Sequence, residues 1–475
     1  MLEIAHKRVL VIGLGASGRA ACQLLRQRGA TVVAIDEADT AGLRQEAAAL
    51  EKMGVRVELR TKGAPEESFD LAVVSPGVPC AGALVRRVVS RGVPLIGELE
   101  LGYDQSRASF VAISGTNGKT TTTELVAQML THTGRRTVAA GNIGLPLCAV
   151  ADSTPDLDYV TLEVSSFQLE TIRFFRPVVA VLMNITPDHL DRYADLAAYA
   201  RVKARLFENQ RPFDWSIIQS AALARLRALD VRLPDRMVTF SASDPQADIF
   251  LDGNRVASRW PPWEGTWLDL RQVRLRGPHN VENLMAALAI GRALELPRDP
   301  TVAALAAYRP APHRCELVAE VRGIQFVNDS KATNVDAVIQ ALLTVRGKSG
   351  LPNVWLIAGG KDKGFDYGEA GPLLSQRVKG AFLLGETRAQ IQSAWERFVP
   401  CTAVDSLLEA VNEAARRAVS GDVVLLSPAC SSFDMFQNYQ HRGEVFRQAV
   451  AVWTQLPSAG GGGGIKPETD FEFKH

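Results

Sequence analysis

The sequence predicts an α/β protein of three domains, each built on a mostly parallel sheet. Short apolar segments are repeatedly followed by glycine-rich turns and helical segments, the order that produces βαβ units. Residues 178–185 are predicted to form one unbroken apolar strand, as expected in a parallel sheet that is buried on both faces. The length of 475 residues suggests three domains of ~150 residues each.

The composition narrows the classes to which the protein can belong. A net charge of +1 argues against a nucleic-acid surface covering the whole protein. The sequence contains no run of about 18 apolar residues, so no transmembrane helix is expected. The six cysteines form no CxxC pair, which fits a reducing cytosol. We therefore expect a cytoplasmic monomer that binds neither nucleic acid nor a membrane.

The first segment, about residues 1–108, contains a G-x-G-x-x-G turn at residues 13–18. A predicted strand at 8–12 precedes this turn, and a helix to about residue 28 and a second strand at 31–35, closed by Asp36, follow it. This Rossmann-like unit predicts a nucleotide or a diphosphate at the helix start, and by itself it also fits a nicotinamide-dependent oxidoreductase. A further strand at 70–74 ends in Ser75-Pro76-Gly77, a tight turn that either frames a ligand crevice or only reverses the chain.

The second segment, about residues 109–311, begins with a strand, a turn of sequence Gly-Thr-Asn-Gly-Lys-Thr at residues 115–120, and a helix at about 119–133. Such a turn directs backbone N–H groups and a helix N-terminus at an anion. Lys119 would meet the outer phosphates of a nucleotide, and the Thr120 hydroxyl would meet Mg²⁺. The strict P-loop spacing is not met because Ile113 replaces the first glycine, so an ordinary glycine-rich turn is the alternative.

Polar residues follow two more strands of this segment. Glu163 ends a strand at 159–163, where a carboxylate is suited to bind Mg²⁺ or is simply solvated. His189 follows the strand at 178–185, at the kind of strand end where an α/β active site lies, although it could be a plain loop histidine. Lys203, on the next helix, would ordinarily be an exposed lysine. Asn283 could hydrogen-bond an adenine.

The third segment, about residues 312–456, predicts another Rossmann-like domain. Its strand ends carry lysines, hydroxyls and glycine turns at residues 328–334, 359–364 and 427–434, a combination that could hold an amino-acid carboxylate. Cys430 is expected to be a buried packing residue because no His–acid partner is evident. Residues 457–475 contain five consecutive glycines and predict a flexible tail.

Together these motifs resemble the Mur ligases over about residues 1–455. The matching stretches occur in the order found in that family, and they are Gly115–Thr120, Glu163–Leu169, Asp188–Arg192, His279–Asn283, His313–Arg314, Asn328–Asn334 and Leu426–Cys430. The Glu-Val-Ser-Ser-Phe-Gln-Leu and Ser-Pro-Ala-Cys-Ser-Ser-Phe-Asp stretches point to the members that add D-glutamate to UDP-N-acetylmuramoyl-L-alanine. The Asp-Asn-Pro-Arg motif of the diaminopimelate-adding members is absent from the sequence.

The resemblance implies an ATP-dependent ligase (EC 6.3.2.9) with two Mg²⁺ ions, which acts through an acyl phosphate in peptidoglycan precursor synthesis. It implies a UDP-substrate domain at 1–108, an ATP-binding domain at 109–311, an amino-acid-binding domain at 312–456 and a tail at 457–475.

The resemblance also assigns roles to individual residues. The implied catalytic residues are Lys119, Glu163, His189 and Lys203, and the implied metal ligands are Thr120, Glu163, His189 and a CO₂-derived carbamate on Lys203. ATP would be bound by Gly115, Thr116, Asn117, Gly118, Lys119, Thr120, Thr121, Asn283, Arg314 and Asp329. The UDP substrate would be bound by Ala16, Ser17, Asp36, Glu37, Ser75, Gly77 and Asn142, with Asn142 near the transferred phosphate. D-Glutamate would be bound by Lys331, Thr333, Lys363, Ser432, Phe433 and Tyr439, with Lys361 as the alternative to Lys363.

Three other interpretations compete with this one. A ligase of the same superfamily that adds L-alanine or extends folate with glutamate would share most of the motifs. A nicotinamide-dependent oxidoreductase would leave the 115–120 turn and the third-domain cluster without a task. A non-catalytic nucleotide-binding module would give Glu163, His189 and Lys203 no reason to assemble.

Overall fold

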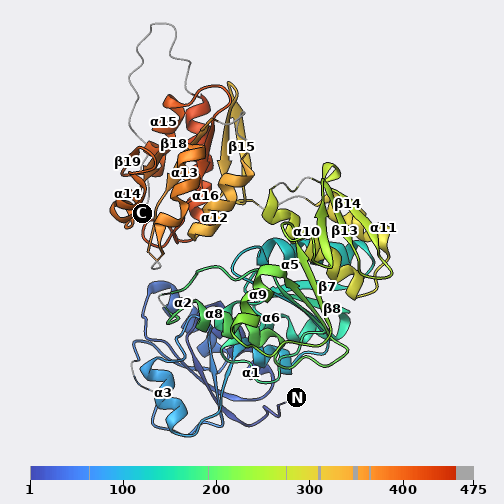
Figure 1. Cartoon of the computed structure of the whole chain (residues 1–475). Helices are drawn as coiled ribbons and strands as arrows, with labels where there is room; N and C mark the ends of the chain where they lie inside the picture. The colour runs from blue at the N-terminus through green and yellow to red at the C-terminus, as the bar shows by residue number, and fades with distance from the viewer. Residues whose placement is uncertain are drawn as a thin grey trace. The chain divides into compact units, whose positions relative to one another are not determined.

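The computed structural model describes residues 2–61, 63, 65–190, 192–273, 275, 277–308, 312–345, 351–362 and 365–455. It confirms the predicted fold class, because three mostly parallel sheets with covering helices form in three successive segments of the chain (Figure 1). The chain divides into two compact units, one mainly of residues 1–311 and the other mainly of the residues from 312 onward. The predicted domain limits stay predictions, and Lys363 and the tail lie outside the described residues.

The first sheet is five-stranded and entirely parallel, in the order β3-β2-β1-β4-β5. Its central strand is apolar from Val9 to Ile12 because both faces are covered: Val9 and Val11 join one core cluster, and Leu10 and Ile12 join another. Its elements are β1 Arg8–Ile12, α1 Ala16–Gln27, β2 Thr31–Ile35, α2 Ala41–Lys52, β3 Arg56–Glu58, β4 Leu71–Val74, α3 Ala83–Ser90, β5 Leu95–Gly97 and α4 Glu98–Asp104.

The central sheet has nine strands in the order β14-β13-β12-β11-β10-β9-β6-β8-β7. Six neighbouring strands from β11 to β7 run parallel, β12 extends them, and β13 and β14 form an antiparallel edge (Figure 1). The strands are β6 Ser109–Ser114, β7 Thr137–Gly141, β8 Tyr159–Glu163, β9 Val179–Leu182, β10 Trp215–Gln219, β11 Met237–Ser241, β12 Ile249–Asp252, β13 Arg255–Ser258 and β14 Gly265–Asp269.

Helices cover both faces of this central sheet. Val111 and Ile113 of β6 pack with residues of α5 and α10, whereas Phe110 and Ala112 face a second core that contains residues of α8 and α9. Trp263 and Trp267 belong to the first of these cores. The helices are α5 Lys119–His132, α6 Leu147–Val150, α7 Ser166–Leu169, α8 Leu196–Ala204, α9 Ser220–Ala228, α10 Pro278–Ala293 and α11 Arg298–Ala307.

The third sheet has six strands in the order β15-β16-β20-β17-β18-β19, with only β15 antiparallel to its neighbour. Residues of α15 and α16 form one core with β16, β18 and β20. The elements are β15 Glu316–Val321, β16 Ile324–Asn328, α12 Val335–Thr344, β17 Val354–Ala358, α13 Gly371–Arg377, β18 Val378–Leu383, α14 Arg388–Trp395, β19 Cys401–Ala403, α15 Leu407–Arg417, β20 Val423–Leu426 and α16 Tyr439–Gln455.

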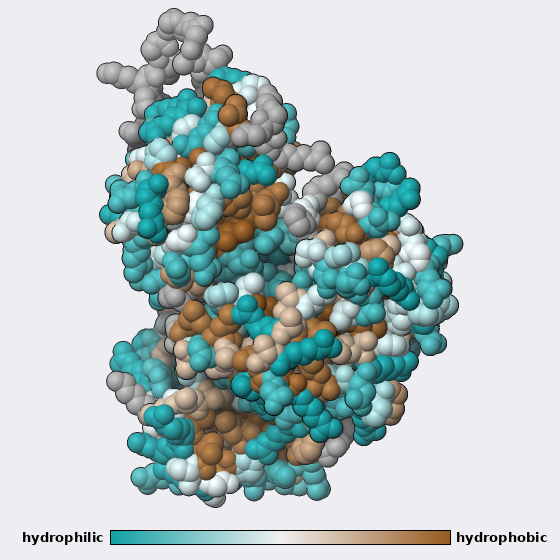
Figure 2. All heavy atoms as spheres, viewed as in Figure 1, coloured by the Kyte–Doolittle hydropathy of each residue, from teal (hydrophilic) through white to brown (hydrophobic). Residues whose placement is uncertain are grey.

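The surface carries both polar and apolar side chains. Figure 2 shows one face on which hydrophilic residues predominate and hydrophobic residues lie in several groups between them. Exposed hydrophobic residues are ordinary on protein surfaces. Among the described helices, none combines the length and the apolar character needed to cross a membrane.

Candidate active site

Three strand ends meet at one edge of the central sheet. The strand β6 lies between β8 and β9, with Ile113 in register with Glu163 and Ser114 in register with Leu182. All three strands are parallel, so their carboxyl ends lie side by side, and ligands of open α/β sheets bind at such an edge. The fold therefore brings the 115–120 turn, Glu163 and the segment that ends at His189 to one place.

The turn after β6 has the geometry of an anion-binding loop. Gly115 and Gly118 have φ values of 149° and 83°, and Gly118 is the N-cap of α5. A Cβ on Gly118 would lie 2.4 Å from Asn283 Oδ1, so only glycine fits this position. Lys119 begins α5, and its ammonium donates to the carbonyls of Gly115 at 2.9 Å and Thr116 at 2.8 Å. The N-terminus of α5, at which Gly118 forms no side-chain cap, and the ammonium of Lys119 thus belong to the same turn.

Asn184, which the sequence analysis did not single out, holds this loop in shape. Its Oδ1 accepts hydrogen bonds from the backbone N–H groups of Thr116 at 3.0 Å and Asn117 at 2.8 Å. Its Nδ2 donates to the Asn117 carbonyl at 3.1 Å. The signal was present in the sequence, since Asn184 is the single polar residue in the apolar stretch 178–185. The strand β9 ends at Leu182 rather than at 185, and this leaves Asn184 free to face the loop.

Glu163 is a buried carboxylate with one unpaired oxygen. The residue is 2% exposed, and its Oε1 accepts a hydrogen bond of 2.8 Å from Asn142 Nδ2. Its Oε2 is buried and has no hydrogen-bond partner among the described residues. Buried polar atoms are rarely left unpaired, and a carboxylate oxygen is a preferred ligand of a hard divalent cation. The donor chemistry at Glu163 therefore fits Mg²⁺.

Lys203 is buried rather than exposed, at 1%. Its Nζ donates to the Gly115 carbonyl at 2.8 Å and lies 4.6 Å from the centroid of the Tyr199 ring. Burial, followed by the charge of Lys119, lowers the pKa of Lys203 well below its usual value, although Asp188 and Glu163 oppose this shift. Lys119, Asp188 and Glu163 therefore all lie near enough to Lys203 to influence its pKa.

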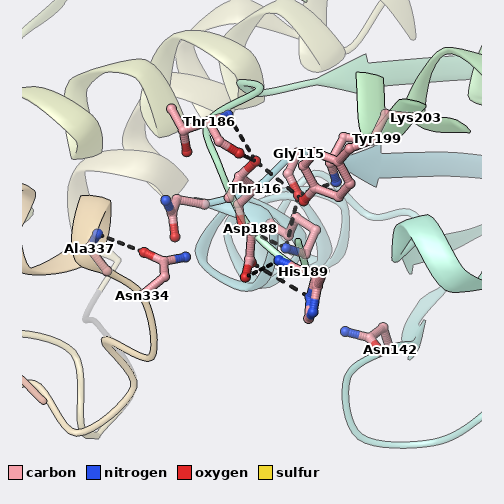
Figure 3. A network of polar contacts seen from close by, with 12 residues as sticks. Gly115, Thr116, Asn142, Thr186, Asp188, His189, Tyr199, Lys203, Asn334 and Ala337 are labelled. Atoms are coloured by element: carbon pink, nitrogen blue, oxygen red, sulfur yellow. Dashed lines mark hydrogen bonds and ion pairs between the residues drawn. The ribbon is translucent and has the colours of Figure 1, made fainter. Parts of the chain in front are cut away.

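His189 lies beside this cluster. Its backbone is left-handed, with φ of 55°, and its N–H donates to Asp188 Oδ1 at 3.0 Å. The ring Nε2 is 3.6 Å from Asp188 Oδ2, and the ring centroid is 4.6 Å from that of Phe167. Figure 3 shows Gly115, Thr116, Asp188, His189, Tyr199 and Lys203 gathered in one network.

The four predicted metal ligands, Thr120, Glu163, His189 and Lys203, differ in chemical type. Only Glu163 and His189 are acidic or histidine side chains. Within the ranges that the structure describes, no three His, Cys, Asp or Glu residues form a metal-binding group. Thr120 lies at the first turn of α5 and is 9% exposed, with Thr121 at 4%.

A cavity of about 720 Å³ adjoins His189. Its lining includes Gly77, Phe167, Glu170 and Arg192. The Arg192 guanidinium pairs with Glu170 at 2.6 Å and donates to the carbonyls of Pro76 at 3.0 Å and Val78 at 3.4 Å. The pair therefore joins the 75–77 turn of the first sheet to the central sheet, and the cavity has the size of a small-molecule site.

In the first segment, two predicted ligand residues already bind the glycine-rich turn. Asp36 Oδ2 accepts from the Leu14 N–H at 2.7 Å, and the Ser75 hydroxyl donates to the Gly13 carbonyl at 2.7 Å. Both side chains thus fix the shape of the turn. Ala16 and Ser17 open α1, whose N-cap Gly15 forms no side-chain cap, whereas Glu37 and Gly77 are exposed.

In the second unit, candidate residues gather around the ends of β16 and β20. Lys331 Nζ lies 4.0 Å from the centroid of the Tyr439 ring. Asp329 accepts hydrogen bonds from the Cys315 N–H at 3.1 Å and the Ser427 hydroxyl at 3.1 Å. Burial raises its pKa to about 7. Arg314 and Thr333 are half-buried, Ser432 is buried and Phe433 is 69% exposed.

Arg442 organises this second cluster, and the sequence analysis missed it. The residue is 2% exposed, and its guanidinium donates to Ser330 Oγ and to the carbonyls of Ser330, Cys430 and Ser431. It thus joins the loop after β16 to the loop after β20. No local sequence motif marks this role, because the partners, most of them main-chain carbonyls, lie 11 to 112 residues away along the chain. Cys430 is fully buried, as predicted, and burial raises its pKa.

Three family models match the chain in order. They are described as Mur ligase MurD-like, N-terminal domain at residues 7–97, Mur ligase middle domain at 113–291, and Mur ligase, glutamate ligase domain at 313–430. A protein of Koribacter versatilis is 40% identical over 94% of this chain and 98% of its own length. A protein of Acidobacterium capsulatum is 41% identical over 94% of this chain and 97% of its own length. The chain therefore belongs to the Mur ligase family.

Within that family, both of these relatives carry the name UDP-N-acetylmuramoylalanine–D-glutamate ligase. Solved structures support the fold. The UDP-N-acetylmuramate–alanine ligase MurC of Thermotoga maritima has a TM-score of 0.59 at 19% identity, covering 94% of this chain and 100% of that chain. MurF of Thermotoga maritima in complex with ADP has a TM-score of 0.59 at 17% identity, covering 95% and 96%.

The raised pKa of Asp329 predicts a pH-dependent stability. The native state holds this proton more tightly than the unfolded chain, in which the pKa is about 3.9. The contribution of protonated Asp329 to the free energy of unfolding is therefore fully present below about pH 4, and it is lost as the pH rises toward 7. We expect Asp329→Asn to gain stability relative to wild type over this interval, as measured by urea denaturation at several pH values. Asp405→Asn, at a side chain that is 90% exposed, is the control, and its free energy of unfolding relative to wild type should not change with pH. The same lack of pH dependence in Asp329→Asn would contradict the raised pKa of Asp329.

Proposed function

We propose that this protein is an ATP-dependent ligase that joins D-glutamate to UDP-N-acetylmuramoyl-L-alanine, in the cytoplasm and as a monomer. The observation that carries the proposal is identity of 40% and 41%, over 94% of the chain, to two relatives that bear the name of this activity. The converging strand ends of the central sheet support it, because they supply the cations and carboxylate that such a reaction needs.

The reaction has two steps. The substrate's terminal carboxylate takes the γ-phosphoryl group of ATP, so that ADP leaves and an acyl phosphate forms. The amine of D-glutamate then attacks the acyl carbon, loses a proton, and displaces inorganic phosphate as the amide forms. Since both carboxylate and triphosphate are anions, catalysis depends on positioning and on neutralising charge.

The loop after β6 would bind ATP. Its backbone N–H groups and the N-terminus of α5 would face the phosphates, and Lys119 would exchange its present loop carbonyls for the β- and γ-phosphate oxygens. Asn283 accepts a hydrogen bond of 3.2 Å from Thr122 of α5, which places it beside the same helix. In the second unit, Arg314 and Asp329 are proposed to complete the nucleotide site.

Glu163, Thr120 and His189 would hold Mg²⁺, with two ions expected for this family. The unpaired Oε2 of Glu163 supports this role, because a carboxylate left unpaired in a buried site is costly without a cation. The ions supply positive charge at the transferred phosphate when bound. Asn142 donates to the other Glu163 oxygen and so fixes the direction of the carboxylate.

Lys203 is proposed to carry a carbamate. Its unprotonated Nζ would attack CO₂, forming an N–C bond and releasing one proton, and the product would be an anion. Complete burial of the side chain and its position against the Gly115 carbonyl support this proposal. The carbamate would add negative charge next to Glu163 and so support the metal.

The two substrates would occupy different parts of the chain. The UDP substrate would lie against Ala16, Ser17, Glu37 and Gly77 and extend into the cavity beside His189, with Asp36 and Ser75 acting by shaping the glycine-rich turn. D-Glutamate would be held by residues of the third segment of the sequence, which are Lys331, Thr333, Ser432, Phe433, Tyr439 and either Lys361 or Lys363.

The amino-acid specificity is testable directly. We expect D-glutamate to stimulate phosphate release from ATP in the presence of UDP-N-acetylmuramoyl-L-alanine, with L-glutamate and L-alanine as matched controls that have little effect. The measurement is the rate of phosphate release together with mass spectrometry of the product. Stimulation by L-alanine alone, or by none of the three, would contradict the proposed function.

The carbamate predicts chemical rescue. Lys203→Ala should lose about 10- to 100-fold of its activity, the range expected for loss of a metal-supporting group. Acetate or formate should restore part of it, because a small carboxylate can enter the space left by the side chain. Lys203→Arg is the matched control and should be inactive and insensitive to acetate, since it fills the space and cannot be carbamylated. High activity in either variant without added carboxylate would overturn the carbamate.

Asn184 predicts a measurable effect on nucleotide binding. Asn184→Ala removes the acceptor for two backbone N–H groups of the loop, and we expect the KM for ATP to rise about 10-fold. Asn209→Ala serves as the control, because its side chain donates to carbonyls of Arg173 and Phe175 instead. An unchanged KM for ATP in Asn184→Ala would show that the loop keeps its shape without this side chain.

A further inference from the structure

The central sheet carries a second cavity that has no task in the proposed reaction. It has a volume of about 490 Å³ and lies between the end of α8, the segment that follows it and residues 231–235. None of the residues assigned above to ATP, metal or substrate lines it. All of its lining residues fall in one compact unit of the chain.

Arginines dominate the polar part of this lining. Arg201, Arg211 and Arg232 are exposed, and among the described residues their guanidinium groups form no hydrogen bond or ion pair. Arg205 differs from them, because its guanidinium already donates hydrogen bonds to Glu208 and to the carbonyls of Leu169, Glu170 and Ile172.

The cavity therefore has an excess of positive charge. Four arginines face only two carboxylates, Glu208 and Asp235, and Glu208 is already paired with Arg205 at 2.8 Å. Three guanidinium groups consequently remain available to an anion. Arginine is suited to such binding because its planar group can donate two parallel hydrogen bonds to a phosphate, sulfonate or carboxylate.

The remaining lining is apolar. Phe207 is 5% exposed, and the half-buried Val231 and Leu233 pack against the same hydrophobic core. Pro212 and Pro234 complete this part of the lining. A bound ligand would thus contact guanidinium groups with one part of the molecule and apolar side chains with another. This mixture of polar and apolar lining is typical of small-molecule sites.

We propose that this cavity binds a small organic anion that carries a phosphate, sulfonate or carboxylate group on an apolar ring or chain. The volume fits a molecule of drug size, because ligand pockets occupy roughly 300–1,000 Å³. The site is separate from the ligase reaction, and the proposal does not depend on it. The link between the two is α8, which carries both Arg201 of this cavity and Lys203 of the active site.

The proposal can be tested with 8-anilinonaphthalene-1-sulfonate, whose sulfonate and aromatic body match the two parts of the lining. The full chain is titrated with the probe in the presence of saturating ADP and UMP, which occupy nucleotide sites elsewhere. Arg201→Gln combined with Arg232→Gln should raise the Kd of a saturable component about 10-fold or more, as expected for loss of charged hydrogen bonds.

The matched control combines Arg225→Gln with Arg227→Gln. Both residues are exposed on α9 and lie outside the cavity lining, so this variant loses the same charge elsewhere. We expect its Kd to stay within about twofold of wild type, well below the change expected for lost charged contacts. Thermal melting of each variant verifies that the fold is kept.

Two results would overturn the proposal. One is equal binding of the probe by the lining variant and the control variant, which would place the probe on another surface. The other is equally tight binding of N-phenyl-1-naphthylamine, the uncharged analogue, because it would show that the cavity does not select an anion.

Discussion

The candidate active site depends on the carbonyl of Gly115, on which two lysines converge. Lys119 donates to it at 2.9 Å from α5, and Lys203 donates to it at 2.8 Å from α8. Two ammonium groups at one carbonyl would repel each other strongly in a buried place. Burial and the charge of Lys119 lower the pKa of Lys203, and this shift reduces the repulsion because it favours loss of the Lys203 proton.

Asn184 also holds this loop, because it accepts hydrogen bonds from the backbone N–H groups of Thr116 and Asn117. Glu163 contributes the opposite charge, with one oxygen bound to Asn142 and the other unpaired. An unpaired buried carboxylate oxygen costs about 1–3 kcal/mol or more. A protein keeps such a group where a ligand relieves the cost, and this supports the proposal that the three strand ends form a reaction site.

Much of the fold was predictable because its signals are local. The limits of β1, β2 and β8 were predicted as observed, since each is a short apolar segment that ends at a glycine or an acid. The helix α5 begins at Lys119, where the glycine turn ends. The strand β9 was predicted too long, because Asn184 leaves the sheet to bind the loop after β6, and this interaction is not local. The role of Arg442 was missed for the same reason.

The sequence by itself determined the three-domain α/β class, the glycine-rich turns and the residue types available for phosphate and metal chemistry, because spacing along the chain encodes strands, turns and helix starts. Only the tertiary structure decided which of these groups meet. It buried Lys203, left one oxygen of Glu163 unpaired, and used Asp36 and Ser75 to shape a turn. The physical reason is that protonation state and hydrogen-bond pairing depend on neighbours from distant strands, which sequence spacing does not specify.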